Sequence, residues 1–122
     1  MTPEDERLAK AFGSALSKIR LRRALARRDL GERVAGYGYL TALEKGSKQP
    51  TIGKVDEIAR ELGVHPLTLI TLAYQARDTA DPLDLMLKIK MELATLKLWP
   101  HAELDIDDDI VGNDEGPEPD NS

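Results

Sequence analysis

Few residues of this 122-residue chain have the types and spacing that catalysis or metal binding requires. There is no cysteine, which excludes disulfides, thiolate zinc sites and cysteine nucleophiles. His65 and His101 show no ligand spacing, and no serine, histidine and acid form a recognisable catalytic signature. A calcium loop counted from Asp107 would need an oxygen ligand where Val111 stands, and no second helix is expected after it. The sequence therefore predicts no enzyme, no metal site and no cofactor.

Basic side chains are concentrated in one part of the chain. Residues 7–60 contain 13 Lys or Arg against five acids, whereas residues 100–122 contain nine acids and no Lys or Arg. The net charge of −5 therefore conceals a basic body and an acidic tail. A basic body favours a polyanionic partner, although a solvated charged surface is the alternative. We expect the acidic tail to be mostly disordered.

The apolar segments are too short for a membrane span. The longest, residues 67–74, is interrupted by threonines, and the acidic N-terminus does not resemble a signal peptide. We expect a cytoplasmic protein with no membrane partner.

Helix formers separated by proline and glycine predict an all-α fold. No stretch shows sustained alternation of apolar and polar residues, so no strand is expected. Thr51 is a typical N-cap, Gly46 and Gly63 are typical helix stops, and Asp81 followed by Pro82 favours a further helix start. We expect a polar hinge at residues 76–82. The expected helices are 4–23, 26–34, 37–45, 52–62, 66–74 and 82–99.

Residues 26–46 have the pattern of a helix-turn-helix. Two short amphipathic segments meet at a turn near Ala35 and Gly36, and cations flank both. Leu40 and Leu43 are expected in the core, which leaves the other face of the second segment for base contacts. The predicted base-contacting residues are Tyr37, Gly38, Thr41, Ala42 and Lys45.

The flanking polar residues suit a clamp on DNA phosphates. Arg and Lys bind phosphate, and a capped helix N-terminus adds backbone donors. Residues 36–39 contain no Arg, Lys, Asn or Gln, so direct readout is expected to be sparse and DNA shape to contribute. The predicted phosphate contacts are Arg20, Arg27 and Arg28 on one side, and Ser47, Lys48, Gln49 and Thr51 on the other.

Five segments together resemble the lambda-repressor-like, xenobiotic-response-element (XRE, Cro-type) helix-turn-helix family. They are residues 16–20, 25–31, 39–46, 49–51 and 58–64, within a match over about residues 12–72. The resemblance implies a five-helix DNA-binding domain and a transcriptional regulator, expected to be a repressor, that binds double-stranded operator DNA.

Three features depart from that family's pattern. Arg27 stands where the family usually has a phosphate-gripping Gln, and Gly31 stands where it usually has Ala. The turn between Gly31 and Glu44 is one residue shorter than usual. Arg remains compatible with phosphate binding, and Gly31 permits close helix contact at a cost in helix propensity of up to about 1 kcal/mol.

The sixth expected helix is apolar on most sides. Its 3-4-3 spacing of apolar residues is typical of a coiled-coil seam, and a second copy of the chain would cover it. Packing within one chain is the alternative. The predicted homodimer interface is Met86, Ile89, Leu93 and Leu96.

These expectations divide the chain into a helix-turn-helix domain at 4–75, a dimerisation helix at 81–99 and an acidic tail at 100–122. Two other functions remain open. One is the DNA-binding antitoxin of a toxin–antitoxin pair, with the apolar helix and acidic tail wrapping a toxin. The other is a helical protein-interaction module that does not bind DNA.

Overall fold

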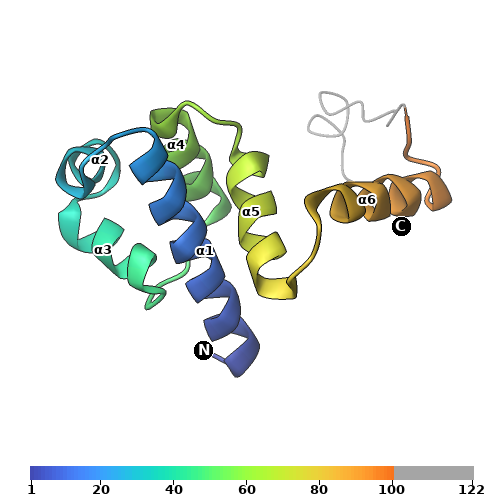
Figure 1. Ribbon diagram of the computed structural model, residues 1–122, viewed down its shortest axis with the longest axis horizontal. Helices are drawn as coiled ribbons and strands as arrows, with labels where there is room; N and C mark the ends of the chain where they lie inside the picture. Colours follow the sequence, from blue (N-terminus) through green and yellow to red (C-terminus); the bar gives the residue numbers. More distant parts are fainter. Residues whose placement is uncertain (101–122) are drawn as a thin grey trace, which may run out of the picture. The chain divides into compact units, whose positions relative to one another are not determined.

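The structure, a computed structural model, describes residues 1–100 and contains six helices and no strand within them, which confirms the predicted all-α class (Figure 1). The expected tail, the calcium-loop alternative and His101 lie outside the described residues. The chain divides into one unit of residues 1–85 and a second unit that begins at Met86, inside the last helix. The helices are α1 (Pro3–Arg22), α2 (Arg27–Val34), α3 (Tyr37–Lys45), α4 (Ile52–Leu62), α5 (Pro66–Asp78) and α6 (Pro82–Thr95).

Local chemistry explains where these helices begin and end. Thr2 and Asp5 form a capping box at the start of α1, and this hydrogen bonding lowers the pKa of the Asp5 carboxyl. Thr51 caps α4 by accepting a hydrogen bond from the Lys54 N–H, as predicted. Gly46 and Gly63 end α3 and α4 with φ values of 76° and 74°, which glycine adopts without strain.

The core of the first unit forms around α1, which packs against both α3 and α5 (Figure 1). Each of the first five helices contributes buried apolar side chains to one cluster. Burial of a leucine or isoleucine side chain stabilises a fold by about 1.5–3 kcal/mol. The largest fully buried side chains are Leu16, Leu30, Leu40, Leu43, Ile58 and Leu69.

Two glycines allow the helices around α3 to approach closely. A Cβ on Gly13 in α1 would lie 2.4 Å from the carbonyl oxygen of Leu43, which no side chain could tolerate without displacing α3. A Cβ on Gly31 in α2 would lie 2.8 Å from the Cα of Tyr37. The close helix contact expected at Gly31 is therefore present.

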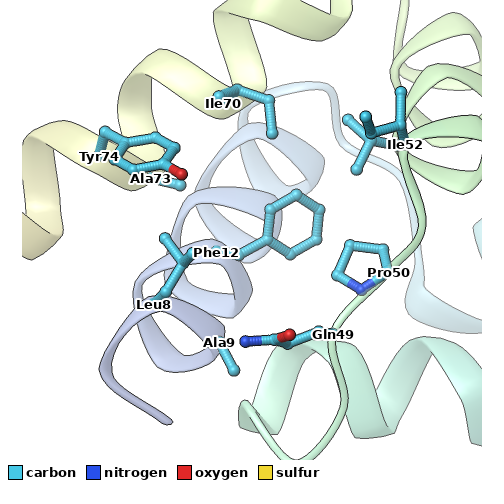
Figure 2. Close-up of a pocket in the computed structure, with 10 residues that line it drawn as sticks. Leu8, Ala9, Phe12, Gln49, Pro50, Ile52, Ile70, Ala73 and Tyr74 are labelled. Atoms are coloured by element: carbon cyan, nitrogen blue, oxygen red, sulfur yellow. The ribbon is translucent and has the colours of Figure 1, made fainter. Parts of the chain in front are cut away.

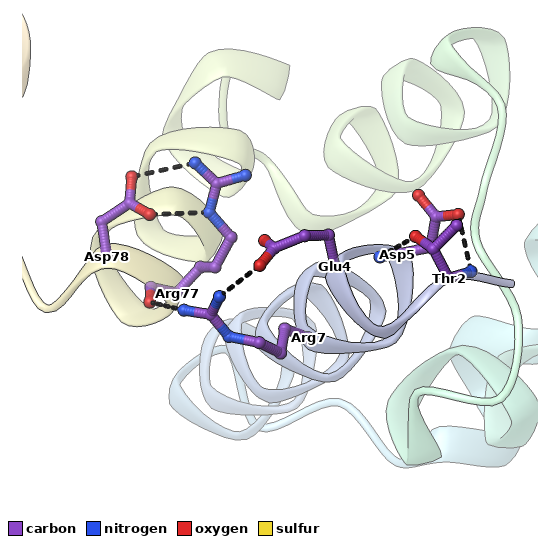
Figure 3. A network of polar contacts seen from close by, with 6 residues as sticks. All are labelled: Thr2, Glu4, Asp5, Arg7, Arg77 and Asp78. Atoms are coloured by element: carbon purple, nitrogen blue, oxygen red, sulfur yellow. Dashed lines mark hydrogen bonds and ion pairs between the residues drawn. The ribbon is translucent and has the colours of Figure 1, made fainter.

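The polar hinge predicted for residues 76–82 is wrong in its first part, because α5 continues to Asp78. Arg77 pairs with Asp78, which raises the pKa of Arg77 and lowers that of Asp78 (Figure 3). Arg7 of α1 donates to the Arg77 carbonyl oxygen at 3.2 Å and pairs with Glu4. These polar contacts hold the last turn of α5 against the start of α1.

Helix α6 ends at Thr95, four residues before the expected end. Lys97 has a φ of 63°, and the Leu98 N–H donates to the Leu93 carbonyl oxygen at 2.7 Å. That pairing satisfies a terminal carbonyl and closes the helix. At the other end, the Asp81 carboxylate accepts from the Leu83 N–H at 2.7 Å, as its predicted capping role requires.

No residue of α6 is buried within the described part of the chain. Its apolar side chains project on several sides, and most are about half exposed or more. Of the four predicted interface residues, Met86, Ile89 and Leu96 are exposed and Leu93 is half-buried. Within residues 1–100, no helix has the length and apolar character needed to cross a membrane.

Candidate nucleic-acid interface

Helices α2 and α3 form a helix-turn-helix with a connection of only Ala35 and Gly36. Gly36 has a φ of 105°, a backbone conformation that residues other than glycine rarely adopt. Its N–H donates to the Gly31 carbonyl oxygen at 2.6 Å, which ends α2 and turns the chain sharply into α3. The turn and the absence of a Cβ at Gly31 therefore fix the angle between the two helices.

Helix α3 presents one exposed face and one buried face. Leu40 and Leu43 are 0% exposed, whereas the Tyr37 side chain at the N-terminal end is 49% exposed. Gly38 and Lys45 are also exposed and Ala42 is half-buried, so these four predicted base-contacting positions lie along a surface that a ligand can reach.

The structure contradicts the predicted hydrogen bond from the Thr41 hydroxyl to a base. Its Oγ1 atom is buried and has no hydrogen-bond partner among the described residues. The predicted contact from this hydroxyl to a base edge is therefore not available in this conformation. Rotation of the side chain would have to expose the oxygen first.

Glu44, whose side chain is 3% exposed, joins three helices through its carboxylate. Arg20 of α1 binds it twice, with Nε 2.6 Å from Oε2 and Nη2 3.1 Å from Oε1. Arg27 of α2 binds the same group, with Nε 3.0 Å from Oε1. The orientation of α3 is thus fixed to both neighbouring helices by charge-assisted hydrogen bonds.

The prediction that Arg20 contacts phosphate is wrong. Its side chain is only 8% exposed, and its third nitrogen donates to the Leu25 carbonyl oxygen at 2.8 Å. All of its donor nitrogens are used inside the protein, so Arg20 stabilises the fold. The role of Glu44 was missed from the sequence, although a carboxylate next to a buried leucine and among cations was the available signal.

The other two arginines of the predicted clamp remain accessible. Arg27 binds Glu44 through Nε, and its side chain is 35% exposed. Arg28 is exposed beside it at the start of α2. Both lie at a helix N-terminus, where the helix dipole also favours an anion.

The connection between α3 and α4 carries the second half of the predicted clamp. Ser47 is held by its hydroxyl, which donates to the Ala42 carbonyl oxygen at 3.1 Å. Lys48 is exposed, and its Nζ lies 5.7 Å from the centre of the Tyr39 ring. Thr51 is exposed at the capped N-terminus of α4. Burial of the Tyr39 ring raises the pKa of its hydroxyl.

Gln49 anchors this connection to α1. Its amide nitrogen donates to the Asp5 carbonyl oxygen in α1 at 3.0 Å. Gln49 and Pro50 also line an apolar pocket of about 140 Å³, where Phe12 and Tyr74 project from α1 and α5 (Figure 2). The connection is therefore packed against the core, which holds Lys48 and Thr51 in place.

Two of the three comparisons with known proteins give no match: no protein-family model fits the chain, and no curated protein is significantly similar to it. Among solved structures, the chain is similar to the crystal structure of the clp gene regulator ClgR from Corynebacterium glutamicum, with a TM-score of 0.56. The sequences are 24% identical, and the match covers 79% of this chain and 96% of that chain. This likeness establishes the all-α fold.

We predict that Glu44→Gln lowers the free energy of unfolding by about 3–5 kcal/mol, because Arg20 would keep its charge in a buried site without a counterion. The matched control is Glu61→Gln, which removes a carboxylate 3.7 Å from Arg33 in a largely exposed pair. That change should cost less than about 1 kcal/mol. Urea denaturation measures both, and equal midpoints for the two variants would contradict the role assigned to Glu44.

Proposed function

We propose that the chain is a sequence-specific DNA-binding transcriptional regulator that acts as a homodimer. The observation that carries this proposal is the exposed face of α3, together with the accessible cations at the start of α2 and in the connection from α3 to α4. The similarity to ClgR, which is described as a clp gene regulator, agrees with a regulatory role.

In the proposed complex α3 enters the major groove, and α2 lies across the phosphate backbone. Arg27 and Arg28 contact one strand from the start of α2. Lys48 and the N-terminus of α4, which Thr51 caps, contact the other strand. Because phosphate contacts fix register and carry no sequence information, these residues set the orientation of α3.

The base contacts come from a small set of side chains. Tyr37 supplies a hydroxyl and an apolar ring, and Lys45 is the one residue of the set that suits the acceptor atoms of guanine. Gly38 and Ala42 allow the helix backbone to lie close to the bases. Few hydrogen bonds to bases are expected, so sequence-dependent DNA shape supplies part of the specificity.

Glu44 acts in this proposal as a positioning residue. It does not face DNA, since its side chain is 3% exposed. It binds the Nε of Arg27 at 3.0 Å, and the Arg27 side chain remains 35% exposed. A guanidinium held in advance loses less conformational entropy when it binds phosphate.

The homodimer is proposed from α6. An amphipathic helix with apolar side chains on several sides needs a cover, and symmetric dimers are the commonest assembly of soluble proteins. Binding of such a dimer over a promoter would exclude other proteins from it, and repression is the action we propose.

We predict that Lys48→Ala weakens binding to all duplexes about equally and lowers the salt dependence of binding by roughly one phosphate contact. Fluorescence anisotropy with one specific and one unrelated duplex, over a range of salt, measures both quantities. Lys88→Ala is the matched control, because Lys88 lies on α6 with Glu92 as its partner. A changed sequence preference with an unaltered salt slope would show that Lys48 reads bases.

We predict that Leu93→Asp converts the dimer to monomers in sedimentation and strongly weakens operator binding. A charge placed in an apolar seam loses its hydration at a cost of several kcal/mol. Thr95→Asp adds the same charge on the helix face of Lys88 and Glu92, and should leave the dimer intact. A Leu93→Asp protein that still sediments as a dimer would remove α6 from the interface.

A further inference from the structure

The apolar pocket beside the connection between α3 and α4 takes no part in the proposed DNA contacts. All of its lining residues lie within residues 1–85, the first unit. Side chains enter the pocket from α1, from α5 and from the segment that leads into α4 (Figure 2). They include Leu8, Phe12, Pro50, Ile52, Ile70 and Tyr74.

Two walls of the apolar pocket are held by contacts outside it. The guanidinium carbon of Arg77 lies 4.5 Å from the centre of the Tyr74 ring, and Arg77 is itself paired with Asp78. On another wall, Gln49 is fixed by its hydrogen bond to the Asp5 carbonyl oxygen. A ligand that enters the pocket therefore has few side chains to order, which favours binding.

The volume of the apolar pocket limits its occupant to a molecule of about one ring. A cavity of about 150 Å³ lined by leucine, isoleucine and phenylalanine binds benzene. This pocket has about 140 Å³ and is lined by the same kinds of side chain. A helix of a partner protein, which is about 10 Å across with its side chains, is too large to enter.

The chemistry of the lining selects an uncharged ligand. None of the described residues that line the pocket is Asp, Glu, Lys, Arg or His. A charged molecule would therefore lose its hydration there without gaining a counterion. An apolar ring gains instead, because it covers side chains that are otherwise in water, and Ile52 at the start of α4 is 90% exposed.

We propose that the apolar pocket binds a small neutral aromatic molecule, and that this ligand is an effector that strengthens DNA binding. The effector role rests on the proposed function. Pro50 and Ile52 line the pocket on either side of Thr51, the N-cap of α4 in the proposed phosphate clamp. A ligand that contacts both residues and Phe12 ties this segment to α1. A segment that is already ordered loses less entropy when it binds phosphate.

Titration of the full chain with fluorobenzene, followed in ¹H–¹⁵N correlation spectra, tests the site without DNA. Saturable shifts should centre on the amides of Phe12, Ile52 and Ile70. Benzoate, which has the same ring with a carboxylate, should bind more than about tenfold more weakly because its charge has no partner in the pocket. Absence of saturable shifts, or shifts centred on the exposed apolar side chains of α6, would overturn the proposed site.

A matched pair of variants tests the lining. Ile52→Ala removes a side chain that lines the pocket but is 90% exposed, so the core is unaltered. Its affinity for fluorobenzene should fall about threefold or more. Leu67→Ala removes a side chain that is 65% exposed near the start of α5 and does not line the pocket, and should leave the affinity unchanged. Equal affinities for the two variants would overturn the assignment.

The effector role has its own measurement, fluorescence anisotropy with a labelled duplex at fixed salt. Saturating fluorobenzene should tighten DNA binding about fivefold or more. An unchanged DNA affinity at saturation would overturn the effector role. Failure to bind any duplex would contradict the proposed function and the effector role with it, whereas the site itself is decided by the spectra recorded without DNA.

Discussion

The carboxylate of Glu44 is the point at which α1, α2 and α3 are joined. It receives hydrogen bonds from Arg20 and Arg27 in a site that excludes most water, since the Glu44 side chain is 3% exposed. A buried charge of this kind is stable only while its partners are present, so the three helices hold one arrangement or lose the interaction together. The close approaches at Gly13 and Gly31 reinforce that arrangement, since neither glycine has a Cβ to keep α3 at a distance.

The same arrangement separates structural from accessible cations. Arg20 is buried and binds Glu44. Arg27 also binds Glu44 but is partly exposed, and Arg28 is exposed. In the connection between α3 and α4, Gln49 binds α1, and Lys48 and Thr51 remain exposed. The positions of the exposed residues in the proposed interface therefore depend on the contacts that neighbouring residues make inside the protein.

The sequence predicted the helices well where strong local signals exist. The bounds of α3 and α4 agree with the prediction, because both ends of each helix have typical capping residues. These are Gly36 and Gly46 for α3, and Thr51 and Gly63 for α4. The predictions failed where tertiary contacts decide. Helix α5 continues beyond Tyr74 to a last turn whose Arg77 carbonyl accepts a hydrogen bond from Arg7 of α1. The burial of Arg20 and of the Thr41 hydroxyl depends on how the helices pack, which spacing along one helix cannot reveal.

Selection of bound duplexes from a random pool tests most directly whether α3 reads DNA sequence. The full chain should enrich a recurring motif, and a dimer should recover two half-sites separated by about one helical turn or a multiple of it. Recovered duplexes with the same base composition at every position as the starting pool, at a salt concentration where binding is measurable, would contradict sequence-specific recognition by α3.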